Sequence, residues 1–161
     1  MPTGSHTETF SSRAIAGDLL DRGLQPGPST TDAIVGVFKF APISQNWDYF
    51  AQVTAQLPRN SRADYKPGRS LNINIRFRYV GLASIVPQLQ INGRVSAKDS
   101  VANASPDDSG GKTIYLSPGA TIAITGKIKA YGFIQLPLYQ NLHGYQLAPK
   151  YTASVGTRFE F

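Results

Sequence analysis

Residues 70–79 read Ser-Leu-Asn-Ile-Asn-Ile-Arg-Phe-Arg-Tyr, and this stretch alternates polar and apolar side chains without a break. Alternation with a period of two is typical of a β-strand whose successive side chains point to opposite faces. One face of this strand carries only large apolar side chains, and the other carries amides and arginines after the initial serine. The stretch therefore predicts a strand with two faces in different surroundings.

Six further stretches alternate in the same way, although the one beginning at residue 33 does so less cleanly. They are residues 33–40, 47–57, 88–98, 114–125, 130–139 and 151–161. Short connections (42–46, 81–84 and 126–127) alternate strictly with long ones (58–68, 99–112 and 140–150). Tight periplasmic turns and long extracellular loops give this rhythm in outer-membrane proteins. We therefore expect an all-β antiparallel meander of about seven strands that forms part of a transmembrane outer-membrane β-barrel.

The composition excludes several classes of protein. The length of 161 residues favours one domain, and 15 Gly with 11 Pro fit strands and turns rather than a helical bundle. The chain has no Cys, which excludes disulfides, thiolate metal sites and a cysteine nucleophile. No apolar run approaches the ~18 residues of a transmembrane helix, a test that does not apply to membrane-spanning strands.

The two faces of the expected strands differ in a way that favours a membrane protein. One face is rich in Asn, Gln, Arg and Lys. The other is apolar and ends in aromatic side chains, namely Trp47, Tyr49, Tyr79, Phe159 and Phe161. A lipid-facing band with an aromatic girdle around a polar lumen has this pattern. The alternative is a water-soluble β-sandwich binding module whose apolar faces pack together.

The net charge of +6 fits nucleic acid, anionic lipid or an acidic solute as a partner. The charged side chains that we assign to the polar face, as lumen-facing candidates, are Lys39, Asp48, Arg76, Arg78, Arg94, Lys98, Arg158 and Glu160. Basic rows in a lumen can guide anionic solutes, whereas charges near the periplasmic end favour an internal ion-pair network. Arg94 and Lys98 are thus the better candidates for solute contacts. Nucleic acid is not expected, because most aromatic residues lie on the opposite face from the bases.

The sequence contains no recognisable catalytic or cofactor-binding constellation, so we expect neither an enzyme nor a bound cofactor. His6 and His143 fall in different expected loops without nearby ligands of the kind that zinc requires. Asp99, Asp107 and Asp108 share one long loop and could supply oxygen ligands to calcium, but their order lacks the EF-hand spacing. A hydrated extracellular loop is the favoured interpretation.

The end of the sequence resembles the C-terminal signal that the outer-membrane assembly machinery recognises. Its alternating residues are Tyr151, Val155, Phe159 and Phe161. Counting strands backwards makes residues 1–32 an extracellular loop segment and residues 33–161 the C-terminal part of a barrel. Because bacterial single-chain barrels have even strand numbers, we expect a longer parent barrel whose signal peptide and N-terminal strands are missing from this sequence.

Short sequence motifs in the loops and strands also match a known family. They are Pro2-Thr3-Gly4-Ser5-His6, Leu24-Gln25-Pro26-Gly27 before Thr31-Asp32, Tyr65-Lys66-Pro67-Gly68, Leu116-Ser117-Pro118-Gly119, and Leu136-Pro137-Leu138-Tyr139-Gln140 followed by Gly144 and Gln146-Leu147. In order and spacing these resemble the C-terminal part of outer-membrane barrels labelled as phenol meta-pathway degradation or transporter-like proteins.

This resemblance covers nearly the whole chain and implies a bacterial outer-membrane location, with the lipid bilayer and the assembly machinery as partners. It implies a passive pore or uptake channel for small solutes, aromatic compounds among them. A structural or adhesive barrel that acts through its long loops is the alternative. The N-terminal strands of such proteins, with any plug or gate that they carry, have no counterpart here.

Overall fold

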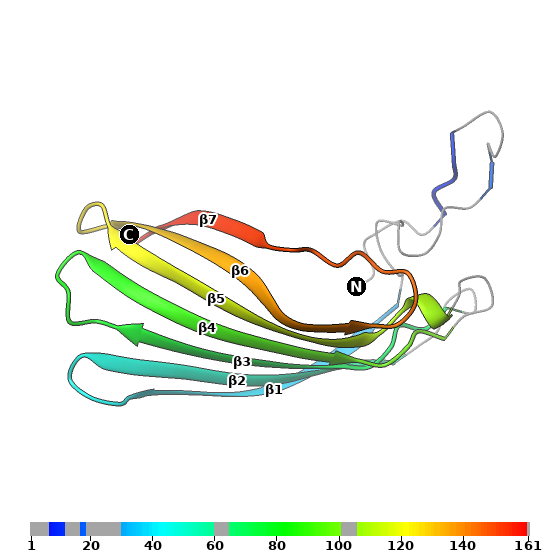
Figure 1. Cartoon of the computed structure of the whole chain (residues 1–161), viewed down its shortest axis with the longest axis horizontal. Helices are drawn as coiled ribbons and strands as arrows, with labels where there is room; N and C mark the ends of the chain where they lie inside the picture. The colour runs from blue at the N-terminus through cyan, green and yellow to red at the C-terminus, as the bar shows by residue number, and fades with distance from the viewer. Residues whose placement is uncertain (1–6, 12–16, 19–29, 60–64, 101–105, 161) are drawn as a thin grey trace.

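The computed structural model describes residues 7–11, 17–18, 30–59, 65–100 and 106–160, and its main feature is one seven-stranded sheet (Figure 1). The elements are β1 (Asp32–Pro42), β2 (Trp47–Pro58), β3 (Ser70–Tyr79), β4 (Ile85–Ser96), the short 3-10 helix η2 (Pro106–Asp108), β5 (Gly111–Ala123), β6 (Ile128–Leu142) and β7 (Thr152–Phe159). The strands follow one another in chain order, and every neighbouring pair is antiparallel. The prediction of an all-β antiparallel meander is confirmed.

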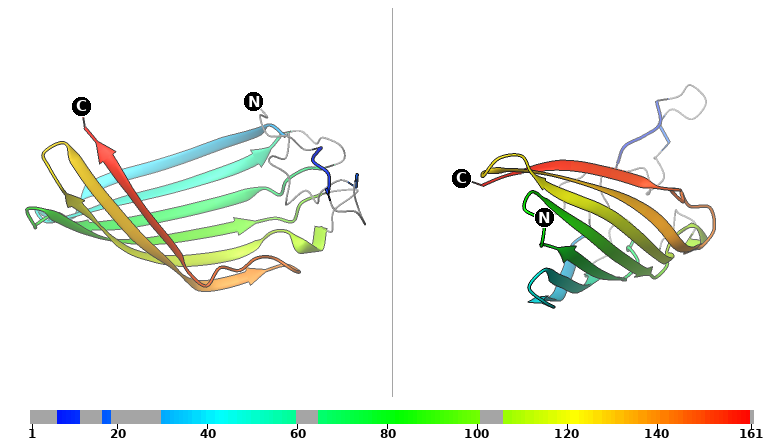
Figure 2. Two further views of the ribbon diagram at one scale, coloured as in Figure 1. Left: turned by 90° about the horizontal axis from the view of Figure 1, so that it is seen from above. Right: turned by 60° about the vertical axis from the view of Figure 1, so that its left-hand side comes forward.

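The connections alternate in length as the sequence predicts, so the sheet has two different ends (Figure 2). Residues 43–46, 80–84 and 124–127 connect strands at one end, which we call the turn end. Backbone hydrogen bonds close two of these turns, from Ile43 N to Trp47 O at 2.8 Å and from Ile124 N to Ile128 O at 2.9 Å. The longer connections lie at the opposite end, which we call the loop end.

The register of the strands separates polar from apolar side chains, because directly paired residues point to the same face. Ile75 lies opposite Ala51 on β2 and opposite Ile91 on β4. Asn74, one position earlier, lies opposite Gln52 and Asn92. The sheet thus has two different faces. We call the face that carries Ile75 and its partners the apolar face, and the face that carries Asn74 and its partners the polar face.

Two local features depart from the alternation expected from the sequence. Lys39 lies opposite Ala51 and therefore on the apolar face, so its assignment to the polar face was wrong. The strand β1 is apolar on both faces, and its alternation therefore carries little information. In addition, the β5–β6 register shifts between Ile114 and Tyr115, which places Tyr139 on the apolar face and Gln140 on the polar face.

The distribution of burial is inverted relative to a water-soluble protein. No hydrophobic side chain is buried among the residues that the structure describes. The buried residues with polar side chains are Thr30, Asp48, Ser70, Gln88 and Ser117, and the other buried residues are Pro58 and Gly111 at strand ends. Large apolar side chains are exposed instead, to 42% at Ile73 and 88% at Val155. The polar face is therefore the inner face of the curved sheet, and the sheet has no apolar core.

The sheet is open, because β1 pairs only with β2 and β7 pairs only with β6. Since odd-numbered strands of a meander run in the same direction, both edge strands run from the loop end to the turn end. A direct pairing of β1 with β7 would be parallel. The described segments contain no helix long and apolar enough to span a membrane. Phe161 and most of the expected loop segment 1–32 lie outside the described residues.

The open edges predict the behaviour of this chain in detergent. Unpaired strand edges leave backbone donors and acceptors without partners in an apolar medium. We expect the chain alone not to form a compact, heat-resistant monomer, as judged by unheated and heated samples in gel electrophoresis. A monomeric band that changes mobility only on boiling, as closed barrels give, would contradict this expectation.

Candidate functional site

Hydrogen bonds between side chains of neighbouring strands order the middle of the polar face. Asn92 Nδ2 donates to Asn74 Oδ1 at 2.9 Å, and Ser117 Oγ donates to Asn92 Oδ1 at 3.1 Å. Nearer the turn end, Gln88 Nε2 donates to Thr121 Oγ1 at 2.6 Å. Direct cross-strand pairing brings Asn74 and Asn92 together, so the register itself creates this polar network.

A two-pronged ion pair forms at the turn end between the paired residues Asp48 of β2 and Arg78 of β3. Arg78 Nε and Nη2 each donate to a different oxygen of the Asp48 carboxylate, both at 2.7 Å. Asp48 is only 8% exposed, and the Arg78 guanidinium also lies 5.6 Å from the centre of the Phe40 ring. Both oxygens of the Asp48 carboxylate thus accept hydrogen bonds from Arg78.

Arg76 lies next to this pair on β3 but forms no salt bridge with a described residue. Its guanidinium lies 5.4 Å from the centre of the Phe50 ring, which in turn stacks on Phe38 at 6.0 Å. Its Nε is shielded from solvent and has no hydrogen-bond partner within the described part of the chain. Arg76 therefore has no carboxylate of its own, since both oxygens of the neighbouring Asp48 are bound by Arg78.

A second ionic cluster lies at the turn end of β6 and β7. Lys129 Nζ donates to Glu160 Oε1 at 2.8 Å, and Arg158 Nε lies 3.6 Å from the same oxygen. Arg158 and Glu160 were predicted from the sequence, whereas Lys129 was not. Lys129 falls just before the expected strand 130–139, but β6 begins at Ile128 and carries Lys129 opposite Arg158.

The two ionic clusters border one hollow of about 390 Å³ on the polar face, which we call the turn-end cavity. Its lining comes from five strands, β3 to β7, and consists of Arg76, Arg78, Val86, Gln88, Thr121, Lys129, Tyr131, Phe133 and Arg158. Four of these side chains are cationic and none is a carboxylate. The fold thus brings together Arg76, Arg78 and Arg158, which the sequence alone could only place on the same face.

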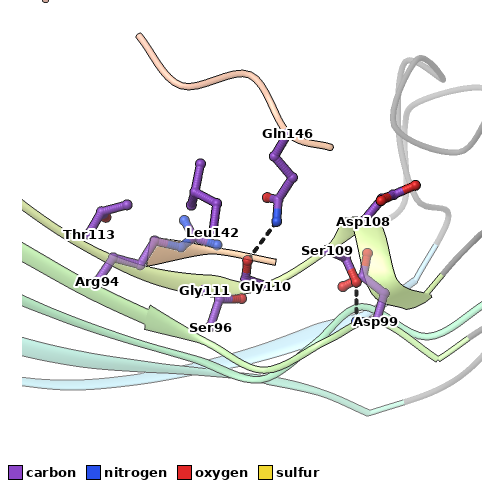
Figure 3. Close-up of a pocket in the computed structure, with 10 residues that line it drawn as sticks. All are labelled: Arg94, Ser96, Asp99, Asp108, Ser109, Gly110, Gly111, Thr113, Leu142 and Gln146. Carbon is purple, nitrogen blue, oxygen red and sulfur yellow. Dashed lines mark hydrogen bonds between the residues drawn. The ribbon is translucent and has the colours of Figure 1, made fainter. Parts of the chain in front are cut away.

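A second hollow, of about 350 Å³, lies near the loop end and contains Arg94 (Figure 3). Figure 3 shows Arg94, Ser96 and Thr113 on the side of the sheet that faces the segment carrying Gln146. The Gln146 side chain donates to Gly110 O at 2.7 Å. The connection between β6 and β7 therefore packs against the start of β5 and covers this part of the polar face.

Lys98, the other candidate for solute contacts, does not line the hollow that contains Arg94. The strand β4 ends at Ser96, and Lys98 Nζ donates to Asp107 Oδ1 at 2.6 Å in the loop region. This hydrogen bond and the charge of Lys98 lower the pKa of Asp107. The positive charge of Lys98 is therefore balanced locally.

The acidic residues of the same loop take part in local hydrogen bonds. Asp99 accepts from Gly68 N at 2.7 Å and from Tyr65 Oη at 2.9 Å, and Asp108 accepts from Tyr145 N at 2.9 Å. Within the described residues, no group of three or more His, Asp or Glu side chains is arranged to bind a metal ion. Residues 101–105 of this loop lie outside the description.

The residues of the expected assembly signal occupy different positions around β7. Val155 and Phe159 lie on the apolar face, opposite Gly132 and Ile128. Tyr151 directly precedes β7 and is exposed, and Phe161 is outside the described residues.

Searches against protein-family models, curated proteins and solved structures found no match for this chain.

The buried ion pair at the turn end predicts the effect of removing its carboxylate. Asp48→Asn leaves the partly buried Arg78 without its charged partner, so the free energy of unfolding should fall by about 2 kcal/mol. Denaturant titration of detergent-solubilised protein measures this change. Asp107→Asn, which removes an exposed ion pair, is the matched control and should leave stability unchanged. Equal stability losses in the two variants would contradict this interpretation.

Proposed function

We propose that this sheet is part of the wall of a bacterial outer-membrane β-barrel that acts as a passive pore or uptake channel for small solutes. The observation that carries the proposal is the inverted burial: polar side chains are buried and large apolar side chains are exposed. In water such a face would be unfavourable by roughly 25 cal/mol for each Å² of apolar surface. In a bilayer the same surface meets hydrocarbon.

The dimensions and the aromatic residues support a membrane-embedded position. The strands have 8 to 15 residues, and a tilted transmembrane strand needs roughly 9–11. At the turn end of the apolar face, Trp47 packs against Tyr79 with ring centres 5.1 Å apart. Aromatic pairs at such a height are typical of the interface between hydrocarbon and headgroups. In this proposal the barrel contains further strands that pair with both open edges.

The polar face supports the assignment of a passive pore. It carries amides and hydroxyls that are fixed by cross-strand hydrogen bonds, together with arginines of which Arg78 is held by Asp48, and this composition suits a water-filled lumen. An excess of cations in a lumen favours passage of anions. The proposal includes assembly by the outer-membrane machinery through the residues around β7, and it assigns no enzymatic activity and no cofactor.

The proposal predicts which side chains a lipid-soluble reagent reaches. The chain has no Cys, so single cysteines at Ile73 and Ile91 on the apolar face, and at Asn72 and Gln90 on the polar face, can be labelled cleanly. In liposomes we expect cysteines replacing Ile73 and Ile91 to react with an apolar maleimide and those replacing Asn72 and Gln90 to react with a charged one. The reverse pattern would exclude a lipid-facing apolar face, and protection of both isoleucine positions from each reagent would favour a β-sandwich.

The proposal also predicts ion selectivity in planar bilayers. Arg94→Gln should lower the anion preference of a channel containing this sheet, because it removes a positive charge from the polar face. Lys98→Gln is the matched control and should change selectivity less, since Asp107 balances this charge. The reversal potential under a salt gradient measures the preference. An equal effect of the two variants would contradict the assignment of Arg94, and a folded barrel without any conductance would favour the adhesive alternative.

A further inference from the structure

The turn-end cavity has an excess of positive charge that the fold does not neutralise. Arg76, Arg78, Lys129 and Arg158 line it, and no described carboxylate does. Asp48 is bound by Arg78, and Glu160 is bound by Lys129 and lies 3.6 Å from Arg158, so two carboxylates are shared among four cations. Arg76 forms no salt bridge with a described residue, and its guanidinium lies over the Phe50 ring. Such a set of cations on an inner face favours a bound anion.

The wall of the same cavity also presents two aromatic rings in fixed positions. Phe133 lies directly over Gly119, and Tyr131 lies directly over Gly156, because a Cβ on either glycine would collide with the ring. Gly119 and Gly156 are the direct cross-strand partners of these aromatic residues on the polar face. The two rings thus pack against the sheet at these glycines, with their centres 6.3 Å apart, and both line the cavity.

We infer that the turn-end cavity is a binding site for a small monocarboxylate that carries a planar aromatic ring. The inference rests on the proposed function insofar as the polar face borders a lumen, and it names the class of solute. The carboxylate is bound by the Arg76 side of the cavity, since guanidinium groups bind carboxylates through paired hydrogen bonds. The ring packs on Phe133 and Tyr131.

Both chemical features are needed to account for the cavity. An inorganic anion would use the cations but would leave the two rings without contact. A neutral aromatic compound would use the rings but would leave the excess positive charge unbalanced. The volume of about 390 Å³ lies in the range of small-molecule sites, roughly 300–1,000 Å³. A single-ring carboxylate satisfies all of these conditions.

The experiment measures equilibrium binding by the whole chain in the form that it adopts after refolding in non-ionic detergent, including forms associated through the open edges, and it does not require flux. The probe is 4-fluorobenzoate, whose fluorine NMR signal shifts and broadens when it is bound. Benzoate should displace the probe at a concentration at least about tenfold lower than acetate, cyclohexanecarboxylate or benzyl alcohol requires. These competitors remove the ring, its planarity and the charge, respectively.

Variants locate the binding in the cavity. Arg76→Gln should weaken probe binding about tenfold and Phe133→Leu at least about threefold. The matched controls are Lys127→Gln and Tyr115→Leu, which change an exposed cation of the β5–β6 turn and an aromatic residue on the polar face, both outside the cavity lining, and should alter affinity less than about twofold. If Arg76→Gln does not fold, Arg76→Lys keeps the charge but loses the paired donors and should still weaken binding.

The outcomes separate this inference from the proposed function. Labelling of cysteines at positions 73 and 72 in the same preparation reports whether the faces are oriented as proposed. Correct labelling without probe binding would overturn the site and leave the pore proposal intact. Equal competition by acetate and benzoate would overturn the role of the rings, and equal competition by benzyl alcohol would overturn that of the cations. Probe binding that responds equally to the cavity variants and their controls would also overturn the inference.

Discussion

Backbone hydrogen bonding between consecutive antiparallel strands is the constraint on which the rest of this structure depends. Apart from Pro58 at the end of β2, no residue with an apolar side chain larger than glycine is buried among the described residues, so packing of a hydrophobic core does not hold the sheet together. Six strand pairs supply the contacts instead. Such ladders are strong where water does not compete for their donors and acceptors. The sheet is therefore suited to a surrounding that is apolar on one face and polar on the other.

The same ladders determine where charges meet, which explains how much of the structure can be predicted from sequence. The alternation in residues 70–79 is enough to predict a two-faced strand, and the lengths of the connections are enough to predict a meander. Where alternation is clean, the face of each residue follows, as for Arg76, Arg78 and Arg94. Direct pairing then turns a shared face into contact, as for Asp48 and Arg78.

The departures have local physical causes that the sequence does not reveal. In β1 both faces are apolar, so the alternation of polar and apolar residues does not identify the face of Lys39. The bulge near Ile114 exchanges the faces of β6 beyond Pro137, and a one-residue slip of this kind leaves no mark in composition. The cavity near the turn end was also inaccessible to sequence reasoning, because it joins β3 to β7 through the curvature of the sheet. Only the folded structure shows that Lys129 and Arg76 line the same cavity.

The placement of aromatic rings over glycines has a consequence for folding. Antiparallel strands with similar faces can pair in registers displaced by two residues without exchanging their faces. Displacement of β6 along β5 by two residues would set the Phe133 ring over Ser117 or Thr121 in place of Gly119, and the ring would meet a side chain. Gly156 restricts β7 in the same way through Tyr131. Gly119 and Gly156 thus favour the observed register and disfavour mispaired intermediates while the sheet assembles.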